Sequence, residues 1–358
     1  MSGILGPPKF SFEYDQRQSP LFSLLPSEIR EEIFAFVLSS YDDTTRAYDK
    51  ETYWARPGHY GPRHVSSDLL RTCKRIYTEA WFMPFIYAEH TEYLTMESRR
   101  PRTATWDDCL KVMDTDYEKL QPRFIRIFAQ MWALEPGDQF QRVLDMPHFY
   151  PKTITLTIRY TDFWFWESDE PLRIDSQWVN RVQFPESVLR FSIEFESIEQ
   201  RKNEVDYLAR EATDKWYFHR KDGFLLTPCE SETSVFKWTG SSCLGGQRWI
   251  RDEVRPGELD YHVKTVTWKL LRERETQATC PALRVPYATR RVVPPHFARS
   301  PSLDVRRLRA AFIPDSVPAD AALVRYDQVY RQGNNPDDYS DYDSDYDIYD
   351  DDDDDDDD

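Results

Sequence analysis

Two amphipathic stretches near the N-terminus constrain the fold more than any other feature of the chain. In residues 20–39, apolar side chains recur at helical spacing along one side: Ile29, Ile33, Phe36 and Val37. Pro26 suits the start of this helix, because its missing N–H has no partner in a first turn. The pattern predicts an amphipathic helix that buries this side.

The second stretch, residues 67–87, predicts a longer helix. Ser67 is a favourable N-cap residue, and Pro84 is expected to end or kink the helix. The apolar residues between them follow the spacing of one helix face: Leu69, Leu70, Cys73, Ile76, Tyr77, Ala80 and Trp81. We expect the two helices to pack against each other and against the domain that follows.

These two stretches also carry a resemblance. The run Leu25-Pro26-Ser27-Glu28-Ile29, followed by Ile33, resembles the opening of an F-box, and LRTCKRIY at 70–77 is similar to its closing helix. The combined pattern resembles the F-box-like proteins of filamentous fungi. It implies a helical hook that docks on a Skp-type adaptor of a cullin–RING ubiquitin ligase, while the next domain selects a protein substrate. The implied apolar contact positions are Leu25, Pro26, Ile29, Ile33, Cys73, Ile76 and Tyr77.

The chain departs from the F-box pattern between these two runs. Residues 41–65 are rich in charged, aromatic, Pro and Gly residues, and they form a longer connection than an F-box normally has. We expect this inserted loop to lie on the surface in place of the middle helix.

Further along the chain, the apolar period changes from helical spacing to two. Ile154, Leu156 and Ile158 alternate with threonines, which is typical of a half-buried strand. Helices are predicted at 106–115, 124–134, 175–183 and 197–214, and strands at 90–96, 153–158, 189–196, 234–239 and 261–271. A turn at Asp222-Gly223 predicts a hairpin over 216–227. The fold class is therefore α+β: a helical F-box-like module packed on a mixed α/β domain with a small, largely antiparallel sheet.

The composition divides the chain into five parts. They are a flexible arm at 1–19, the helical module at 20–96 with its inserted loop, the α+β domain at 97–280, a Pro- and Arg-rich linker at 281–336 with short helices near 305–312 and 320–332, and a tail at 337–358. Asp fills 15 of the tail positions, so the rest of the chain carries only −2 of the formal net charge of −17. Such a run of like charges predicts a disordered tail.

Motifs of catalysis or cofactor binding are not found in the sequence. There is no phosphate-binding Gly-rich loop and no nucleophile elbow, and the five Cys residues form no CxxC pair. Glu194 and Glu196 share one strand face and could do acid–base work, but a solvated face is the favoured interpretation. Gly245-Gly246-Gln247 resembles the tripeptide of peptide-release factors, and a β-turn is the favoured alternative. We expect no enzyme activity, no cofactor and no metal.

The sequence therefore predicts a non-enzymatic interaction protein, an F-box-like adaptor or substrate receptor. The alternative is a protein that uses its acidic tail to bind basic partners such as histones or ribosomal proteins. Dense aromatics without interleaved basic residues argue against a single-stranded nucleic acid as ligand. No apolar run reaches the length of a membrane span, and the scattered Cys residues fit a reduced compartment, cytoplasmic or nuclear.

Overall fold

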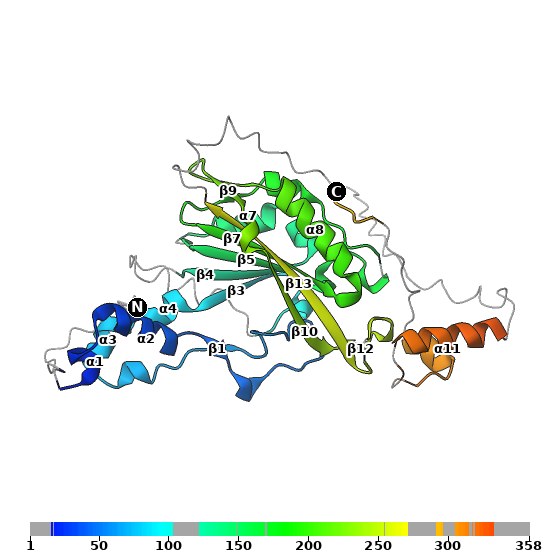
Figure 1. Ribbon diagram of the computed structural model, residues 1–358, viewed down its shortest axis with the longest axis horizontal. Helices are drawn as coiled ribbons and strands as arrows, with labels where there is room; N and C mark the ends of the chain where they lie inside the picture. Colours follow the sequence, from blue (N-terminus) through cyan, green and yellow to red (C-terminus); the bar gives the residue numbers. More distant parts are fainter. Residues whose placement is uncertain are drawn as a thin grey trace, which may run out of the picture.

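A computed structural model describes most of the chain and shows an α+β architecture (Figure 1). The residues described are 16, 18–102, 122–147, 149–168, 170–253, 255–270, 291–295, 305–314, 317 and 319–332. The predicted helix at 106–115, the tail and nearly all of the N-terminal arm lie outside these residues. In Figure 1 the N-terminal helices form one end of the molecule, a large sheet forms the middle, and α11 lies at the other end.

The sheet has nine strands in the order β3-β4-β5-β7-β13-β9-β8-β6, and β10 also pairs with β13. Their bounds are β3 Glu89–Leu94, β4 Phe124–Ala129, β5 Thr153–Ile158, β6 Gln183–Phe184, β7 Arg190–Ile198, β8 Phe218–Arg220, β9 Leu225–Pro228, β10 Ser234–Ser241 and β13 Glu258–Leu270. The four neighbouring strands β3, β4, β5 and β7 are parallel to one another, and β13 is antiparallel to β7, β9 and β10. The expectation of a small, largely antiparallel sheet is therefore wrong. The long connections before β4, β5 and β7 let the chain cross back, as parallel neighbours require.

The predicted helix at 124–134 is also wrong, because its first half forms strand β4. Ile125 and Ile127 are buried on one side of the sheet and Phe128 on the other. β4 lies between two parallel neighbours, where strands read as nearly continuous apolar runs, and Arg126 is its one charged residue. A short apolar run of this kind does not distinguish a strand from a helix by its period. The short helix α6, Met131–Leu134, follows it.

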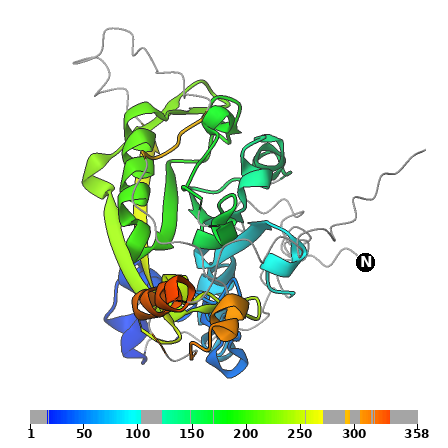
Figure 2. The ribbon, with the colours of Figure 1, turned by 90° about the vertical axis from the view of Figure 1, so that its right-hand side faces the viewer.

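One face of the sheet carries the main hydrophobic core. Helix α8, Lys202–Lys215, lies along this face (Figures 1 and 2), and α7, Asp138–Leu144, and the 3₁₀ turn η7, Ser176–Asn180, cover the rest. The predicted apolar stripe of α8 is buried here: Val205, Leu208, Ala209 and Ala212. Large aromatic rings fill the space between the layers: Phe140, Trp178, Phe184, Phe191, Trp216, Phe218 and Trp268. The predicted hairpin is confirmed as β8 and β9.

The helical end consists of α1, Pro20–Ser23, α2, Ser27–Val37, the turn η2, Leu69–Arg71, α3, Lys74–Ala80, and α4, Met83–Tyr87. The single helix predicted for 67–87 is thus broken twice. The first break is at Cys73, whose backbone is extended and whose Sγ accepts the Ile76 N–H (3.4 Å) as the N-cap of α3. The second break falls before Pro84, which lies in the first turn of α4.

Two short strand pairs and several 3₁₀ turns lie outside the large sheet. β1, Tyr41–Asp42, pairs with β2, Arg63–His64, and closes the 41–65 segment. β11, Cys243–Leu244, pairs with β12, Gln247–Arg248, across a turn formed by Gly245 and Gly246, so the β-turn interpretation of this loop is confirmed. The remaining 3₁₀ turns are η1 Thr44–Arg46, η3 Glu97–Arg99, η5 Tyr160–Asp162, η6 Trp166–Ser168, η8 Glu199–Arg201, η9 Glu230–Glu232 and η10 Ile250–Asp252.

Beyond the main domain, two helices pack onto it where the chain is described. They are α10, Val305–Ala310, and α11, Ala319–Gln332, near the expected positions. A small apolar cluster joins them to η10: Ile250, Leu308, Ala311, Ile313, Val317 and Ala322. These parts of 281–336 therefore belong to the folded body. None of the helices within the described ranges has the length and apolar composition needed to span a bilayer.

Candidate functional site

Helix α2 presents a row of apolar side chains to solvent. Ile33 is 38% exposed and Phe36 is 83% exposed, whereas Phe34 and Leu38 on the opposite side are 1% and 0% exposed. We call the exposed row, together with Leu24 at the end of α1, the α2 face: Leu24, Ile29, Ile33, Phe36 and Val37. The expectation that this stripe is buried is wrong, because α2 packs onto α3 and α4 with its other side.

The rotation of α2 is fixed by contacts on its inner side. The Arg30 Nε donates to Glu79 Oε2 on α3 (3.1 Å), and its Nη1 donates to the Leu25 carbonyl (2.9 Å). Below them, Phe34 packs in a cluster with Leu38, Ile76, Ala80 and Met83. Turning the α2 face inward would break both sets of contacts. These contacts therefore keep the α2 face exposed in the folded protein.

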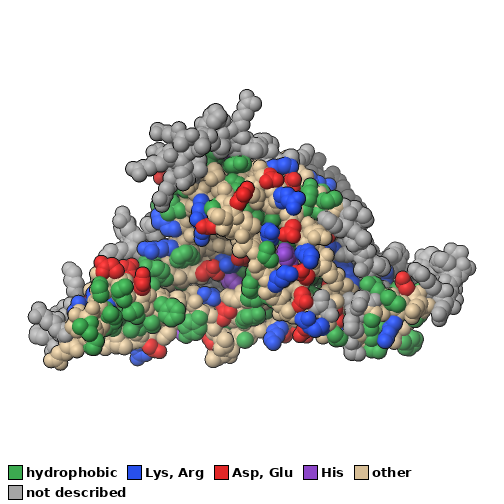
Figure 3. Space-filling model, in the orientation of Figure 1, with side chains coloured by type: hydrophobic (Ala, Val, Ile, Leu, Met, Phe, Trp, Pro, Cys, Tyr) green, Lys and Arg blue, Asp and Glu red, His purple; other side chains and the backbone are tan. Residues whose placement is uncertain are grey.

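Acidic side chains border the α2 face. Glu28 and Glu32 are exposed on the same helix. Figure 3 shows hydrophobic side chains gathered over the helical end, with acidic side chains along one edge. The surface is thus apolar with a negative border.

The positions implied by the F-box resemblance divide between the two sides of the helical end. Pro26 is the exposed N-cap of α2, Leu25 is half-buried beside it, and Ile29 and Ile33 lie in the α2 face. Ile76, in contrast, is only 5% exposed beneath α2. Cys73 caps α3, and Tyr77 is half-buried on it. These seven residues do not form one continuous surface.

The second candidate region is the sheet face opposite the core, which carries a chain of ionic contacts. Arg126 on β4 donates through Nε to Glu89 Oε1 (2.9 Å) and through Nη1 to Glu194 Oε2 (2.7 Å). Thr157 on β5 also donates to Glu194 (2.7 Å). The side chain of Glu194 is 16% exposed and Glu196 is 2% exposed. The solvated face expected for these two glutamates is therefore wrong.

The 41–65 segment covers part of this polar sheet face. The Nη2 of Arg56 lies 3.4 Å from Glu194 Oε2 and 3.2 Å from Glu196 Oε2. The His59 ring packs edge-on against Phe128, with centroids 5.1 Å apart. Much of the segment is exposed, as the sequence predicted for a surface loop, but Arg56 and His59 are buried against the sheet. The sheet carboxylates pair with the arginine that this segment supplies.

This environment shifts the pKa values of the ionisable groups in different directions. Burial raises the pKa of Glu196 above its ordinary value. Burial acts in the same direction on Glu194, but Arg126 and Arg56 outweigh it and hold the pKa of that carboxyl below its usual range. Burial lowers the pKa of His59. The ionic contacts run Glu89–Arg126–Glu194–Arg56–Glu196, with His59 beside Glu89.

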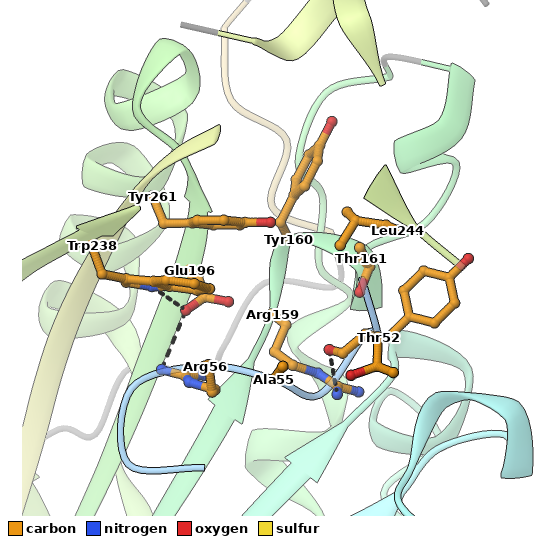
Figure 4. Close-up of a pocket in the computed structure, with 11 residues that line it drawn as sticks. Thr52, Ala55, Arg56, Arg159, Tyr160, Thr161, Glu196, Trp238, Leu244 and Tyr261 are labelled. Atoms are coloured by element: carbon orange, nitrogen blue, oxygen red, sulfur yellow. Dashed lines mark hydrogen bonds and ion pairs between the residues drawn. The ribbon is translucent and has the colours of Figure 1, made fainter. Parts of the chain in front are cut away.

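A small cleft, partly open to solvent, lies next to Arg56. It is lined by the 41–65 segment, the ends of β5 and β7, and strands β10, β11 and β13: Thr52, Tyr53, Ala55, Arg56, Arg159, Tyr160, Thr161, Glu196, Trp238, Leu244 and Tyr261. Figure 4 shows the Trp238 and Tyr261 rings parallel on one side and Leu244 and Thr161 on the other. The two rings are stacked with centroids 4.1 Å apart, and Trp238 Nε1 donates to Glu196 Oε2 (3.1 Å).

Arg159 fixes another wall of the cleft. Its Nε and Nη2 donate to the two carboxylate oxygens of Asp162 (2.6 and 2.9 Å), and its Nη1 donates to the Tyr53 carbonyl (3.0 Å). All three nitrogens of its guanidinium group are thus engaged. Sequence reasoning missed this cleft, since Arg56 and Glu194 are 138 residues apart and no local spacing connects them.

Comparison with known proteins does not identify the chain. No family model, no curated protein and no solved structure matches it. Over the described ranges, no group of three or more His, Cys, Asp or Glu side chains is arranged to hold a metal ion. The α2 face is therefore the feature on which a function can be argued.

Proposed function

We propose that this protein is a non-enzymatic interaction protein, an F-box-like adaptor or substrate receptor, that binds a Skp-type adaptor through the α2 face. The observation that supports the proposal is the outward apolar row on α2. It includes Ile29 and Ile33, which the F-box resemblance also assigns to adaptor contact.

The energetic cost of such a row favours a partner. A fully buried aliphatic or aromatic side chain contributes about 1.5–3 kcal/mol relative to an exposed one. The chain leaves four large apolar side chains in water on one short helix, with Leu24 just before it, although α2 has a second apolar side that packs internally. Contiguous exposed apolar patches mark interaction surfaces.

The geometry of the row suits a helix that docks in a groove. Ile29, Ile33, Phe36 and Val37 follow the i, i+4, i+7, i+8 spacing of anchor residues in helix-in-groove recognition. The bordering Glu28 and Glu32 favour a partner with basic residues around an apolar groove, because complementary charge speeds association and excludes wrong partners. We therefore expect adaptor binding that weakens as the salt concentration rises.

The test is co-purification with a recombinant Skp-type adaptor. Ile33→Asp and Phe36→Asp place a charge in the apolar interface, and each is expected to weaken binding by more than about tenfold while leaving the melting temperature near that of the parent protein. Phe236→Asp is the matched control, because Phe236 is 49% exposed on β10, away from the helical end.

Three outcomes would contradict the proposal. One is a parent protein that fails to bind the adaptor at micromolar concentration. A second is a Phe236→Asp variant that binds as weakly as the α2 variants. The third is loss of binding on deletion of residues 337–358, which would favour the acidic tail as the binding element instead.

A further inference from the structure

We propose that strand β10 is a dimerisation edge, at which two copies of this chain pair their β10 strands antiparallel about a two-fold axis and so join their sheets. The proposal goes beyond adaptor binding by the α2 face and does not depend on it. It rests on the free edge of β10, on its exposed apolar side chains and on the way its sequence complements itself.

β10 lies at an edge of the large sheet. Within the described chain it pairs with β13 alone, and Figure 2 shows it in yellow-green along one margin of the molecule. The pairing is unbroken from Ser234, opposite Thr265, to Ser241, opposite Glu258. At about 3.4 Å per residue, the eight residues of β10 form an edge about 27 Å long.

The backbone groups of every second residue of β10 point away from β13. In an antiparallel pair, residues that exchange both backbone hydrogen bonds alternate with residues that exchange none. The Ser242 N–H donates to the Gly257 carbonyl (3.0 Å), which continues the β10–β13 register by one step. Counting back from Ser242, the even-numbered residues bond to β13. Residues 235, 237, 239 and 241 therefore direct their N–H and C=O groups outward, as a template for another strand.

β10 has few of the features that protect a sheet edge in monomeric proteins. Protected edges are short or bulged, or they carry Pro and several charged residues. β10 has no Pro and no bulge, and Lys237 is its one charged residue. Val235 and Phe236 are each 49% exposed. A second strand would cover both this apolar surface and the outward backbone groups.

The order of residues along β10 favours a second copy of the chain as that strand. A two-fold axis through Trp238 pairs residue 235 with 241 and residue 237 with 239 of the other copy, so every outward backbone group has a partner. An axis through Lys237 would leave residue 241 without a partner in β10. It would also place two lysines directly opposite each other, which destabilises a strand pair.

The aromatic side chains agree with the axis through Trp238. Phe236 then lies opposite Gly240 of the other copy, where there is no side chain to compete for the space. The Trp238 ring of that copy already covers Gly240, because a Cβ added there would lie 2.6 Å from the ring. The exposed Phe236 ring of one copy therefore meets the Trp238 ring of the other, and cross-strand aromatic pairs stabilise sheets.

The charges of the two edges are also complementary in this register. Lys237 lies opposite Thr239 of the other copy, and the Thr239 hydroxyl donates to Asp260 Oδ1 (2.7 Å) on β13. The lysine of each copy is thus directed along a row that holds an acidic residue of the other. A contact made by one strand is at the small end of specific interfaces, so we expect a dimer that forms at micromolar concentration and dissociates on dilution.

The experiment is sedimentation velocity on the full chain over a concentration series from nanomolar to high micromolar. The parent protein is expected to shift from the mass of one chain to that of two. Phe236→Asp removes the exposed ring and is expected to weaken the dimer by at least about tenfold. Phe36→Asp on the α2 face is the matched control, because Phe36 is 83% exposed, and it should dimerise like the parent protein.

A second variant tests the backbone pairing. Val235→Pro removes an outward N–H that β13 does not use, and Pro is tolerated on the solvent side of an edge strand. The variant should keep the parental melting temperature and dimerise at least about tenfold more weakly. If it does not fold, Phe236→Asp still tests the edge, since it changes only an exposed side chain.

Cysteine cross-linking tests the register. Paired residues of an antiparallel ladder have Cα atoms about 5.5 Å apart, within the range of a disulfide. A mixture of Lys237→Cys and Thr239→Cys chains should therefore form a cross-linked dimer under mild oxidation, in higher yield than either variant alone. A higher yield from Lys237→Cys alone would place the axis at Lys237 and contradict the proposed pairing.

The dimer itself is overturned by either of two results. One is a parent protein that sediments as a single chain throughout the micromolar range, which would leave the β10 edge to a segment of another protein. The other is a dimer that Phe36→Asp dissociates while folded Phe236→Asp and Val235→Pro retain it, which would assign self-association to the α2 face.

Discussion

Two phenylalanines on α2 allow a direct test of the orientation of this helix. Phe34 is 1% exposed, and Phe36, two residues later, is 83% exposed. Replacing Phe34 by Ala removes a ring from the cluster that contains Leu38, Ile76 and Met83, and we expect a loss of about 3–5 kcal/mol in the free energy of unfolding of the helical end. Replacing Phe36 by Ala should change that free energy by less than about 0.5 kcal/mol. The difference is at least about seventyfold in the unfolding equilibrium.

Hydrogen exchange measured by mass spectrometry is the suitable assay, because it reports each element separately. Phe34→Ala should speed exchange in α3 and α4 while leaving β13 in the main core unchanged. Phe36→Ala should leave exchange in α3 and α4 at the parental rate and weaken only adaptor co-purification. If Phe36→Ala accelerated exchange as much as Phe34→Ala, the assignment of the inner and outer sides of α2 would be refuted.

Two further predictions concern the 41–65 segment and its neighbours. Burial lowers the pKa of His59, so as the pH falls the unfolded chain takes up a proton near pH 6.5, before the folded protein does. The melting temperature should therefore fall as the pH drops from 7 to 5. His59→Gln should reduce this fall, whereas a variant of the exposed His64, His64→Gln, should show the full fall; an unchanged pH dependence in His59→Gln would contradict the reasoning. Gly245 and Gly246 both have positive φ, 61° and 82°, but only a Cβ on Gly245 would collide with Tyr53, at 2.0 Å from Oη. Gly246→Ala should therefore lower the free energy of unfolding by about 1–2 kcal/mol, and Gly245→Ala should lower it by clearly more. Thermal unfolding measures both losses, and equal losses would argue against this contact with Tyr53.

The sequence predicted the elements of the helical end better than their packing. Periodicity identified α2 and its apolar stripe, but α2 is apolar on two sides. Ile29 and Ile33 lie on one side, and Phe34 and Leu38 on the other. Which side is buried depends on the arginine–glutamate contact with α3, a residue pair 49 positions apart. Local periodicity carries no information about such a contact.

The sheet shows a similar limit. The regular alternation of β5 and β7 predicts strands, whereas the mostly apolar residues 124–134 predict a helix where β4 begins. The alternation also placed Glu194 and Glu196 on the polar face, as the structure has them. It could not predict that this face is covered, because the covering residue Arg56 comes from a segment 138 residues away whose sequence has the composition of a loop.

The 41–65 segment bears on how this protein can be divided for experiments. A fragment that ends after the helical end would keep Arg56 and His59 without the carboxylates and the Phe128 ring that bury them. A fragment that begins at β4 would keep Glu194 and Glu196 without one of their cations. Each fragment would expose charged or aromatic side chains that are paired or covered in the whole chain. Removing one partner of a buried ion pair costs about 3–5 kcal/mol. The helical end and the sheet domain should accordingly be expressed, exchanged or fused as a single unit, even though the 41–65 segment has the composition of a dispensable insertion.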